Sequence, residues 1–213
     1  MTEESRPAGS GRLIVLEGID GSGKSSLAAW LARRLTDAGN STVLRREPTD
    51  GPAGQELRRI ITEGRKGIAP EAETALFIED RRQHVASGIG PDLEAGRVVI
   101  LDRYYLSTAA YQGALGMDSE AIMAENESFA PPPDLALLLD LPVSTALERI
   151  TIGRGGQRSA FEKQAYLEKV RKLFLGLRRP WIRLVDAVPP QPHLQEAVLA
   201  IMREKLPDLF VGE

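Results

Sequence analysis

The sequence contains no cysteine, which excludes disulfide bonds, thiolate metal sites and a cysteine nucleophile. It also lacks any apolar run of the roughly 18 residues that a membrane-spanning helix needs. Basic residues are slightly outnumbered, 27 against 30 acidic ones, and a net charge of -3 argues against a general nucleic-acid-binding surface. These absences fit a cytoplasmic protein without a membrane or nucleic-acid partner, in which any anionic substrate is held by a local cluster of arginines.

The N-terminal residues 1–11 are polar and lack the apolar segment of a signal peptide, so we expect a flexible tail. The composition, 42% hydrophobic and 27% charged, is ordinary for a globular protein. No repeat or long low-complexity tract divides residues 12–213, and three prolines at 131–133 lie only a residue before a predicted strand. We therefore expect one domain over residues 12–213.

Short apolar segments alternate with helical patterns along this domain. The segments at 13–17, 98–101 and 135–139 are typical of buried parallel strands, and weaker patterns at 42–46 and 182–185 complete five. Leucines recur every four residues after the first segment, the spacing of a helix. Strands alternating with helices in this way predict an α/β fold with a five-stranded parallel sheet flanked by helices.

A glycine-rich segment follows the first predicted strand and matches the phosphate-loop pattern G-x-x-x-x-G-K-[ST]. The glycines let backbone N–H groups point at phosphate oxygens, and the following helix adds its positive N-terminal end. Lys24 is expected to reach the β- and γ-phosphates, and the Ser25 hydroxyl to coordinate Mg²⁺. This P-loop NTPase site for ATP comprises Gly18, Ile19, Asp20, Gly21, Ser22, Gly23, Lys24, Ser25 and Ser26.

The phosphate loop alone indicates nucleotide binding and leaves the reaction open. A GTPase would need an N-K-x-D segment to recognise guanine, and the sequence has none. A DNA-dependent motor would usually be larger and more basic. A small-molecule kinase needs a second, arginine-rich pocket for the phosphoryl acceptor, and the remaining motifs are consistent with such a pocket.

Two candidate acceptor segments precede the third strand. Arg46-Glu47-Pro48 ends the second strand, and parallel sheets bind ligands at the carboxyl ends of their strands. Phe77 and Arg81 share one face of a predicted helix, where a ring can stack on a base and a guanidinium can bond its edge. Taken singly, such residues are more often a core aromatic and a solvated arginine, so their joint occurrence carries the argument.

Two further segments follow the third strand. Asp102 leaves that buried strand near the phosphate loop, where a carboxylate can assist Mg²⁺, and Arg103 can grip a phosphate. Residues 107–113, Ser-Thr-Ala-Ala-Tyr-Gln-Gly, come directly downstream. We therefore expect both segments to face the same site as the phosphate loop.

Together these motifs resemble those of the thymidylate kinase family. Five segments occur in the family's order and spacing, over roughly residues 13–175: E-G-I-D-G-S-G-K-S, R-E-P, L-F-x-x-D-R-x-Q-H, V-I-L-D-R-Y-x-x-S-T-x-A-Y-Q-G and P-D-L-x-L-x-L-D. The resemblance implies transfer of the γ-phosphoryl group of ATP to dTMP, giving dTDP and ADP for dTTP synthesis. It also implies Mg²⁺ as cofactor and a homodimer as the assembly.

The resemblance further implies individual roles. Phe77 would stack on thymine and Arg81 would hydrogen-bond its O4, while Tyr111 would lie against the sugar and disfavour a 2′-hydroxyl. The implied acceptor-binding residues are Glu47, Pro48, Phe77, Arg81, Arg103, Thr108, Tyr111 and Gln112, and the metal ligands are Ser25 and Asp102, the latter directly or through water. The implied catalytic residues are Lys24, Arg103 and Asp20, joined by an arginine of the lid, either Arg158 or Arg154.

The lid is expected at about residues 152–160, a basic, glycine-rich segment between two helices. Bacterial members of the family that lack an arginine in the phosphate loop supply it from this segment. Many relatives have an aspartate–arginine pair where this chain has Ser159-Ala160, so Arg154 and Arg158 both stay candidates. The segment Thr49-Asp50-Gly51 also departs from the family's Gly-Gly-Thr.

Two alternatives remain open at this point. The first is a kinase for another nucleoside monophosphate, or for a deoxynucleoside whose 5′-hydroxyl Glu47 would activate. The second is a nucleotide-binding regulatory protein that has lost turnover, an interpretation that only the altered lid supports. A panel of acceptors assayed with ATP would separate these possibilities.

Overall fold

The computed structural model describes residues 11–65, 67–151 and 160–211. The expected tail at 1–10 and the lid segment at 152–159 lie outside these residues. Gly11, which the sequence places in the tail, is buried and its N–H donates to the carbonyl of Leu93 at 2.9 Å. In the part of the chain that the structure describes, every helix is too short or too polar to cross a membrane.

Five parallel strands form one sheet, as predicted, in the order β2-β3-β1-β4-β5. Their bounds are β1 (Arg12–Gly18), β2 (Thr42–Arg46), β3 (Val98–Asp102), β4 (Leu135–Asp140) and β5 (Ile182–Asp186). The central strand β1 pairs with β3 on one side and β4 on the other. The carboxyl ends of these three strands therefore meet at one edge of the sheet, where the phosphate loop begins.

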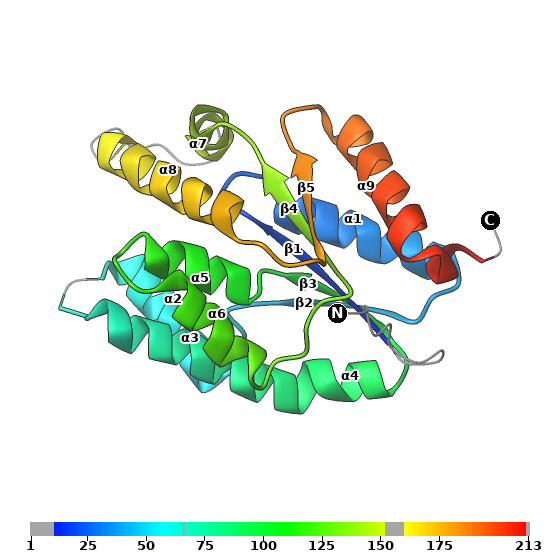
Figure 1. Ribbon diagram of the computed structural model, residues 1–213, viewed down its shortest axis with the longest axis horizontal. Coiled ribbons are helices and arrows are strands. Elements are labelled where there is room, and N and C mark those ends of the chain that lie inside the picture. Colours follow the sequence, from blue (N-terminus) through cyan, green and yellow to red (C-terminus); the bar gives the residue numbers. More distant parts are fainter. Residues whose placement is uncertain (1–10, 66, 152–159, 212–213) are drawn as a thin grey trace.

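Helices cover both faces of the sheet, with α1 and α9 on one side and the group α2–α6 on the other (Figure 1). The helices on the first side are α1 (Lys24–Asp37) and α9 (Gln191–Lys205), followed by η2 (Pro207–Phe210). The second group comprises α2 (Pro52–Glu63), α3 (Pro70–His84), η1 (Val85–Ile89), α4 (Gly90–Glu94), α5 (Tyr105–Gly113) and α6 (Ser119–Glu127). The helices α7 (Val143–Thr151) and α8 (Ala160–Gly176) flank the lid segment.

The core explains why the strands read as continuous apolar runs. Side chains on both faces of β1, β3 and β4 are covered, so their residues are buried almost without exception. The periodic leucines of α1, Leu27, Leu31 and Leu35, are at most 2% exposed against the sheet. Burial of a leucine of this kind contributes about 1.5–3 kcal/mol to folding.

One helical segment departs from the regular pattern. Helix α3 continues through a π-helical turn, η1, into α4, so the chain from Pro70 to Glu94 is continuously helical (Figure 1). Gly88 in the π turn lies against Arg45, and a Cβ there would approach the guanidinium to 2.9 Å. The π turn is therefore the part of this helical segment that lies against β2, at the edge of the sheet.

Candidate functional site

The phosphate loop turns tightly between β1 and α1. Gly18, Gly21 and Gly23 have φ angles of 138°, 85° and 93°, a region that glycine adopts without steric penalty. A Cβ on Gly21 would come within 2.4 Å of the carbonyl of Ala146, so the loop also packs closely against α7. Ile19 is anchored in the core, and Ser26 is exposed in the first turn of α1. The φ angles of the three glycines are those that a tight, glycine-rich phosphate loop requires.

Lys24 is buried within this loop. Its ammonium donates to the carbonyl of Ile19 at 2.8 Å and to the Ser22 hydroxyl at 3.3 Å. Burial lowers the pKa of Lys24 to about 7, assisted by the nearby charge of Arg103 and opposed by neighbouring carboxylates. A buried cation of this kind is stabilised when an anion occupies the loop.

Ser25 and Asp102 form a pair of oxygen ligands beside the loop. The Ser25 hydroxyl donates to Oδ2 of Asp102 at 2.5 Å. The other carboxylate oxygen, Oδ1, is buried and has no hydrogen-bond partner among the described residues. Hydroxyl and carboxylate oxygens suit Mg²⁺, which usually takes few protein ligands and completes its shell with phosphate and water. The unpaired oxygen therefore fits the predicted metal site.

Arg103 lies between the phosphate loop and α5. Its φ of 71° is in the left-handed region, an unfavourable conformation for a residue with a side chain and one that is found where function requires it. The guanidinium contacts Asp20 of the loop at 2.5 Å and the Ser107 hydroxyl on α5 at 3.0 Å. It also lies 5.2 Å from the ring centroid of Tyr111. One side chain thus touches both predicted substrate sites.

Asp20 is held on two sides. Besides its ion pair with Arg103, its backbone N–H donates to the Tyr111 hydroxyl at 3.0 Å. Burial alone would raise the pKa of Asp20, but the charges of Arg103 and Lys24 lower it overall. Asp20 therefore stays ionised at neutral pH and fixes the orientation of Arg103.

A cavity of about 310 Å³ opens beside Arg103. It is lined by Asp20, Arg46, Glu47, Pro48, Arg58, Ile61, Arg65, Phe77, Arg103, Ser107, Thr108 and Tyr111. Three elements expected to form an acceptor pocket, the end of β2, the helix α3 and the start of α5, therefore converge as predicted from their motifs. A wider surface groove of about 600 Å³ between α7 and α8 contains none of the predicted site residues.

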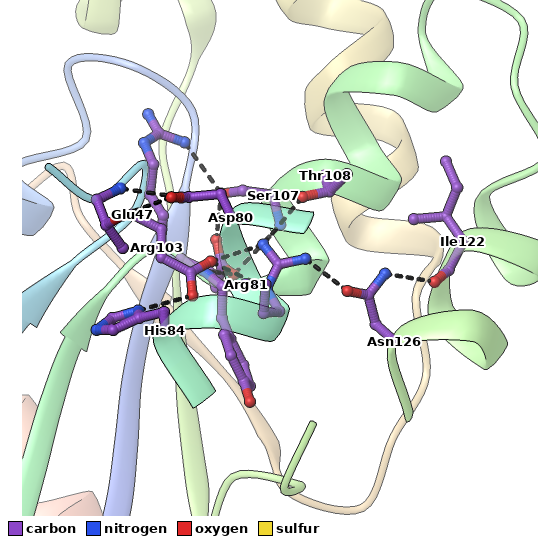
Figure 2. Close-up of polar contacts among 12 residues, drawn as sticks. Glu47, Asp80, Arg81, His84, Arg103, Ser107, Thr108, Ile122 and Asn126 are labelled. Atoms are coloured by element: carbon purple, nitrogen blue, oxygen red, sulfur yellow. Dashed lines mark hydrogen bonds and ion pairs between the residues drawn. The ribbon is translucent and has the colours of Figure 1, made fainter. Parts of the chain in front are cut away.

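Arg81 lies behind the wall of this cavity rather than in its lining. Its guanidinium bonds Oε2 of Glu47 at 2.9 and 2.7 Å, the Thr108 hydroxyl at 3.1 Å and the Asn126 amide oxygen at 2.6 Å (Figure 2). His84 places Nδ1 3.0 Å from the other oxygen of Glu47. These side chains form a buried polar network that joins α3, α5 and α6 to the end of β2, and neither Arg81 nor His84 is a solvated helix residue.

The segment that departs from the family motif is fixed by the same helix. Asp80 of α3, 1% exposed, accepts from the Thr49 N–H at 2.9 Å and from its hydroxyl at 2.5 Å. Arg58 of α2 donates to the Thr49 carbonyl. Thr49 therefore forms contacts through its hydroxyl that a glycine could not, and the loop beside Pro48 is held in place.

Gln112 is fully buried, and neither its amide oxygen nor its amide nitrogen has a partner among the described residues. An unpaired buried amide costs about 1–3 kcal/mol, so we expect a water or ligand to bond Gln112, which is not among the residues that line the cavity. Phe77 presents its ring to the cavity from α3, and Tyr111 does so from α5. The lid arginines, Arg154 and Arg158, fall outside the described residues.

Sequence reasoning missed three residues that line the cavity, Arg58, Ile61 and Arg65. Arg58 and Ile61 are three residues apart on α2, a spacing that places them on one helical face and could have revealed them, whereas Arg65 follows the helix, which ends at Glu63. Arg65 also pairs with Glu73 at 2.8 Å. The cavity is consequently richer in cations than the recognised motifs suggested.

A phosphate loop on the central strand and a second, arginine-lined cavity joined to it by Arg103 define a P-loop kinase that acts on a small phosphorylated molecule. The family model of thymidylate kinase matches residues 16–198, which is most of the chain. A thymidylate kinase from Desulfotalea psychrophila is 45% identical over 92% of this chain and 96% of its own length. One from Xanthomonas campestris is 48% identical over 100% of this chain and 91% of its own length.

The chain therefore belongs to the thymidylate kinase family, as the motifs indicated, and is an ATP-dependent nucleoside monophosphate kinase. The crystal structure of thymidylate kinase from Ehrlichia chaffeensis matches the fold with a TM-score of 0.73 at 25% identity. That match covers 91% of this chain and 99% of the other. The predicted P-loop NTPase fold is confirmed.

Proposed function

We propose that this protein transfers the γ-phosphoryl group of ATP to dTMP, giving dTDP and ADP. The observation that carries the proposal is the position of Arg103, whose guanidinium contacts Asp20 in the phosphate loop and Ser107 in the acceptor cavity. A cation at that junction can hold the acceptor phosphate next to the transferring group. Family membership supports dTMP as the acceptor.

On the donor side, Lys24 would exchange its contacts with Ile19 and Ser22 for phosphate oxygens of ATP. Ser25 and Asp102 would hold Mg²⁺, directly or through water, and the bound ion would neutralise charge on the phosphates. The charged form of the buried lysine is stabilised in this arrangement, because the phosphates of ATP bring negative charge next to its ammonium group.

On the acceptor side, Phe77 would stack on the thymine ring and the unpaired amide of Gln112 would bond the edge of the base. Tyr111 would lie against the sugar, held there by its contact with Asp20. Arg58 and Arg65 add positive charge around the acceptor. Arg81 would act from behind the wall, by fixing Glu47 and Thr108.

The reaction would be a direct in-line transfer. An oxygen of the acceptor phosphate forms a bond to the γ-phosphorus while the bond to the β,γ-bridging oxygen breaks, and ADP leaves with that electron pair. The acceptor phosphate is already an anion, so no strong base is required. Catalysis then consists of positioning and charge neutralisation by Lys24, Arg103 and a lid arginine, Arg154 or Arg158.

The same proposal extends to the assembly and setting of the enzyme. The family resemblance supports a homodimer, and the absence of cysteine is compatible with the cytoplasm. A net charge of -3 supports small-molecule substrates rather than nucleic acid as partners. Light scattering would test the dimer, since a single chain has a mass of 23.2 kDa.

A coupled assay of ADP release with ATP and Mg²⁺ tests the proposed acceptor. The panel comprises dTMP, dUMP, UMP, dCMP, dGMP and thymidine. We expect a strong signal with dTMP, a weaker one with dUMP and little with the others. A stronger signal with another monophosphate would overturn the acceptor assignment, and a signal with thymidine alone would overturn the transfer to a phosphate. No signal with any acceptor would contradict turnover itself.

A further inference from the structure

Glu17 is a fully buried carboxylate one residue before the phosphate loop. Its Oε1 accepts from the backbone N–H of Tyr104 at 2.8 Å and from that of Ser107 at 3.2 Å. Its Oε2 accepts from the Ser107 hydroxyl at 2.5 Å. These three bonds all come from Tyr104 and Ser107, at the start of α5. This segment is far from Glu17 in the sequence but adjacent to it in space.

Helix α5 needs this carboxylate because it has no cap of its own. The residue at its N-cap is Tyr104, which makes no side-chain capping bond. Free N–H groups at a helix start are normally satisfied by a neighbouring serine, threonine or aspartate. Glu17, which lies on β1, accepts from these N–H groups instead, and its negative charge is favourable at the positive end of the helix. The helix that presents Thr108, Tyr111 and Gln112 is thus fixed from β1.

The same carboxylate reaches Arg103 through one hydroxyl. Ser107 donates to Glu17 and accepts from Nη1 of Arg103 at 3.0 Å, while Nη2 of Arg103 bonds Asp20 at 2.5 Å. Arg103 is therefore held at one terminal nitrogen by Ser107, which bonds Glu17, and at the other by Asp20 of the phosphate loop. A side chain in a left-handed backbone conformation persists only when its surroundings fix it in this way.

We propose that Glu17 is a positioning residue for phosphoryl transfer, which holds Arg103 and the start of α5 in register with the phosphate loop through Ser107. Glu17 touches neither substrate. It determines where the acceptor phosphate lies relative to the donor, because β1 carries both Glu17 and the loop. The inference rests on the proposed role of Arg103 as the ligand of the acceptor phosphate.

Three titratable side chains interact with Glu17: Arg103, Lys24 and Tyr105. Burial raises the pKa of Glu17 to about 7, although the Ser107 hydroxyl, Arg103 and the backbone N–H groups all oppose that change. Lys24 of α1 also interacts with Glu17 electrostatically, as does the Tyr105 hydroxyl of α5. Ionised Glu17 accepts all three bonds with the assistance of its charge, whereas the protonated carboxyl accepts them more weakly, so the clamp loosens as the group gains its proton.

The variant Glu17→Gln tests the proposal because it keeps the shape and removes the charge. KM for dTMP, KM for ATP and kcat are measured at pH 6, 7 and 8 for both proteins. At pH 8 we expect KM for dTMP to rise about tenfold, the scale of one charge-assisted bond, and KM for ATP to stay within about twofold. The ratio of the two proteins' KM values for dTMP should fall toward one at pH 6, where wild-type Glu17 is protonated too. The acceptor's own phosphate ionisation, near pH 6, cancels in this ratio.

A purely structural Glu17 would give a different result. In that case the variant would lose thermal stability while both KM values and their pH dependence stayed as in the wild type, and the proposal would be overturned. A parallel rise of both KM values would overturn it as well. The matched control is Asp92→Asn, which changes another buried carboxylate, one that lies on α4 and is paired with Arg45 and Arg97. Its KM ratio should stay near one at every pH.

Ser107→Ala provides a second test should Glu17→Gln fold poorly. Removal of the hydroxyl breaks the relay while the N–H bonds to Glu17 remain, so KM for dTMP should rise and its pH dependence should flatten. In the double variant, the increase in KM should be smaller than the product of the single increases, because both changes break one connection. Independent, multiplicative effects would contradict the relay.

The wild-type panel separates the two proposals. Activity with another monophosphate would overturn dTMP as the acceptor, and the KM comparison would then be made with that monophosphate, because Arg103 binds the phosphate and not the base. Wild-type activity with dTMP and an unchanged Glu17→Gln ratio would overturn the positioning role alone. Absence of any acceptor activity would overturn both.

Discussion

Lys24 is only 5% exposed, and its ammonium group makes its hydrogen bonds within the phosphate loop itself. Its removal takes a positive charge from the transferring phosphates without opening the main core. We expect Lys24→Ala to lower kcat by at least about a hundredfold while circular dichroism and thermal unfolding stay close to wild type. Lys205→Ala, at the end of α9, is the matched control and should retain full activity. A folded Lys24→Ala protein with near-normal turnover would disprove the assigned role.

Glu47 accepts from two buried partners, Arg81 and His84, at the centre of the network behind the acceptor cavity. Glu47→Ala would leave the guanidinium of Arg81 buried without its carboxylate, and we expect a loss of about 3–5 kcal/mol in the free energy of unfolding. Urea denaturation measures this loss. Glu120→Ala removes an exposed carboxylate from its pair with Arg179 and should change the same quantity by less than about 1 kcal/mol. Equal losses in the two variants would contradict the network.

Individual contacts of this network are the part of the site that sequence could not supply. The motifs predicted that Arg81 and Phe77 face the acceptor, and Phe77 does line the cavity. The bonds of Arg81 join it to Glu47 and to Asn126, which are 34 and 45 residues away in the chain. No local spacing encodes such pairs, because they depend on how α3 packs against α2 and α5 in the folded chain. The role of Arg81 toward the base stays a prediction.

At the scale of elements, the strands were predictable and the adjustments between elements were not. A short run of apolar residues is typical of a strand that is covered on both faces. The run before Asp102 therefore predicted the strand Val98–Asp102. The π turn at Val85–Ile89 has no such signal in the local sequence, and its Gly88 lies against Arg45 of β2, which is distant in the chain. The cap of α5 has no local signal either, since Glu17 lies 87 residues before Tyr104 in the chain.

That cap gives α5 a pH-dependent effect on stability. Burial raises the pKa of Glu17 from 4.5 to about 7 in the folded chain. Between these values the folded state keeps a proton that the unfolded state has released, so this group lowers stability as pH rises from about 4.5 to about 7. Glu17→Gln cannot release a proton and should lack this slope.

Urea denaturation of both proteins at pH 5, 6, 7 and 8 measures the slope. We expect the free energy of unfolding of the wild type to fall relative to Glu17→Gln by on the order of 1–3 kcal/mol across this range, and the difference to level off above it. Parallel pH curves for the two proteins would show that Glu17 titrates as an ordinary carboxylate. The variant should therefore become relatively more stable at the pH where it binds dTMP less well.

At the scale of the whole molecule, sheet register brings distant motifs together. Leu16 lies opposite Asp102 and Gly18 opposite Leu139, so the phosphate loop, the Asp102-Arg103 pair and the end of β4 share one edge. The helices α3 and α5 contact one another and contribute Phe77 and Tyr111 to the lining of the acceptor cavity. Their order along the chain predicted this convergence, because parallel strands place all their carboxyl ends on the same side.

Metal dependence follows from this arrangement of the whole chain. Among the described residues, no group of three or more histidine, aspartate or glutamate side chains gathers as a metal site. The pair Ser25 and Asp102 offers too few ligands to hold Mg²⁺ tightly without the nucleotide. We therefore expect EDTA to abolish ADP release while leaving the thermal midpoint of the nucleotide-free protein unchanged, and added Mg²⁺ to restore turnover.

Thermal unfolding with each substrate completes that test. At a hundred times its dissociation constant, dTMP should stabilise the protein by about 2.7 kcal/mol with or without EDTA, because Arg103 and its neighbours bind the acceptor without metal. Stabilisation by ATP should weaken in EDTA, since the metal joins the nucleotide to Ser25 and Asp102. If EDTA lowered the midpoint of the free protein, the ion would belong to the fold rather than to the substrate. If it removed the effect of dTMP, the acceptor would depend on the metal and not on the arginines around the cavity.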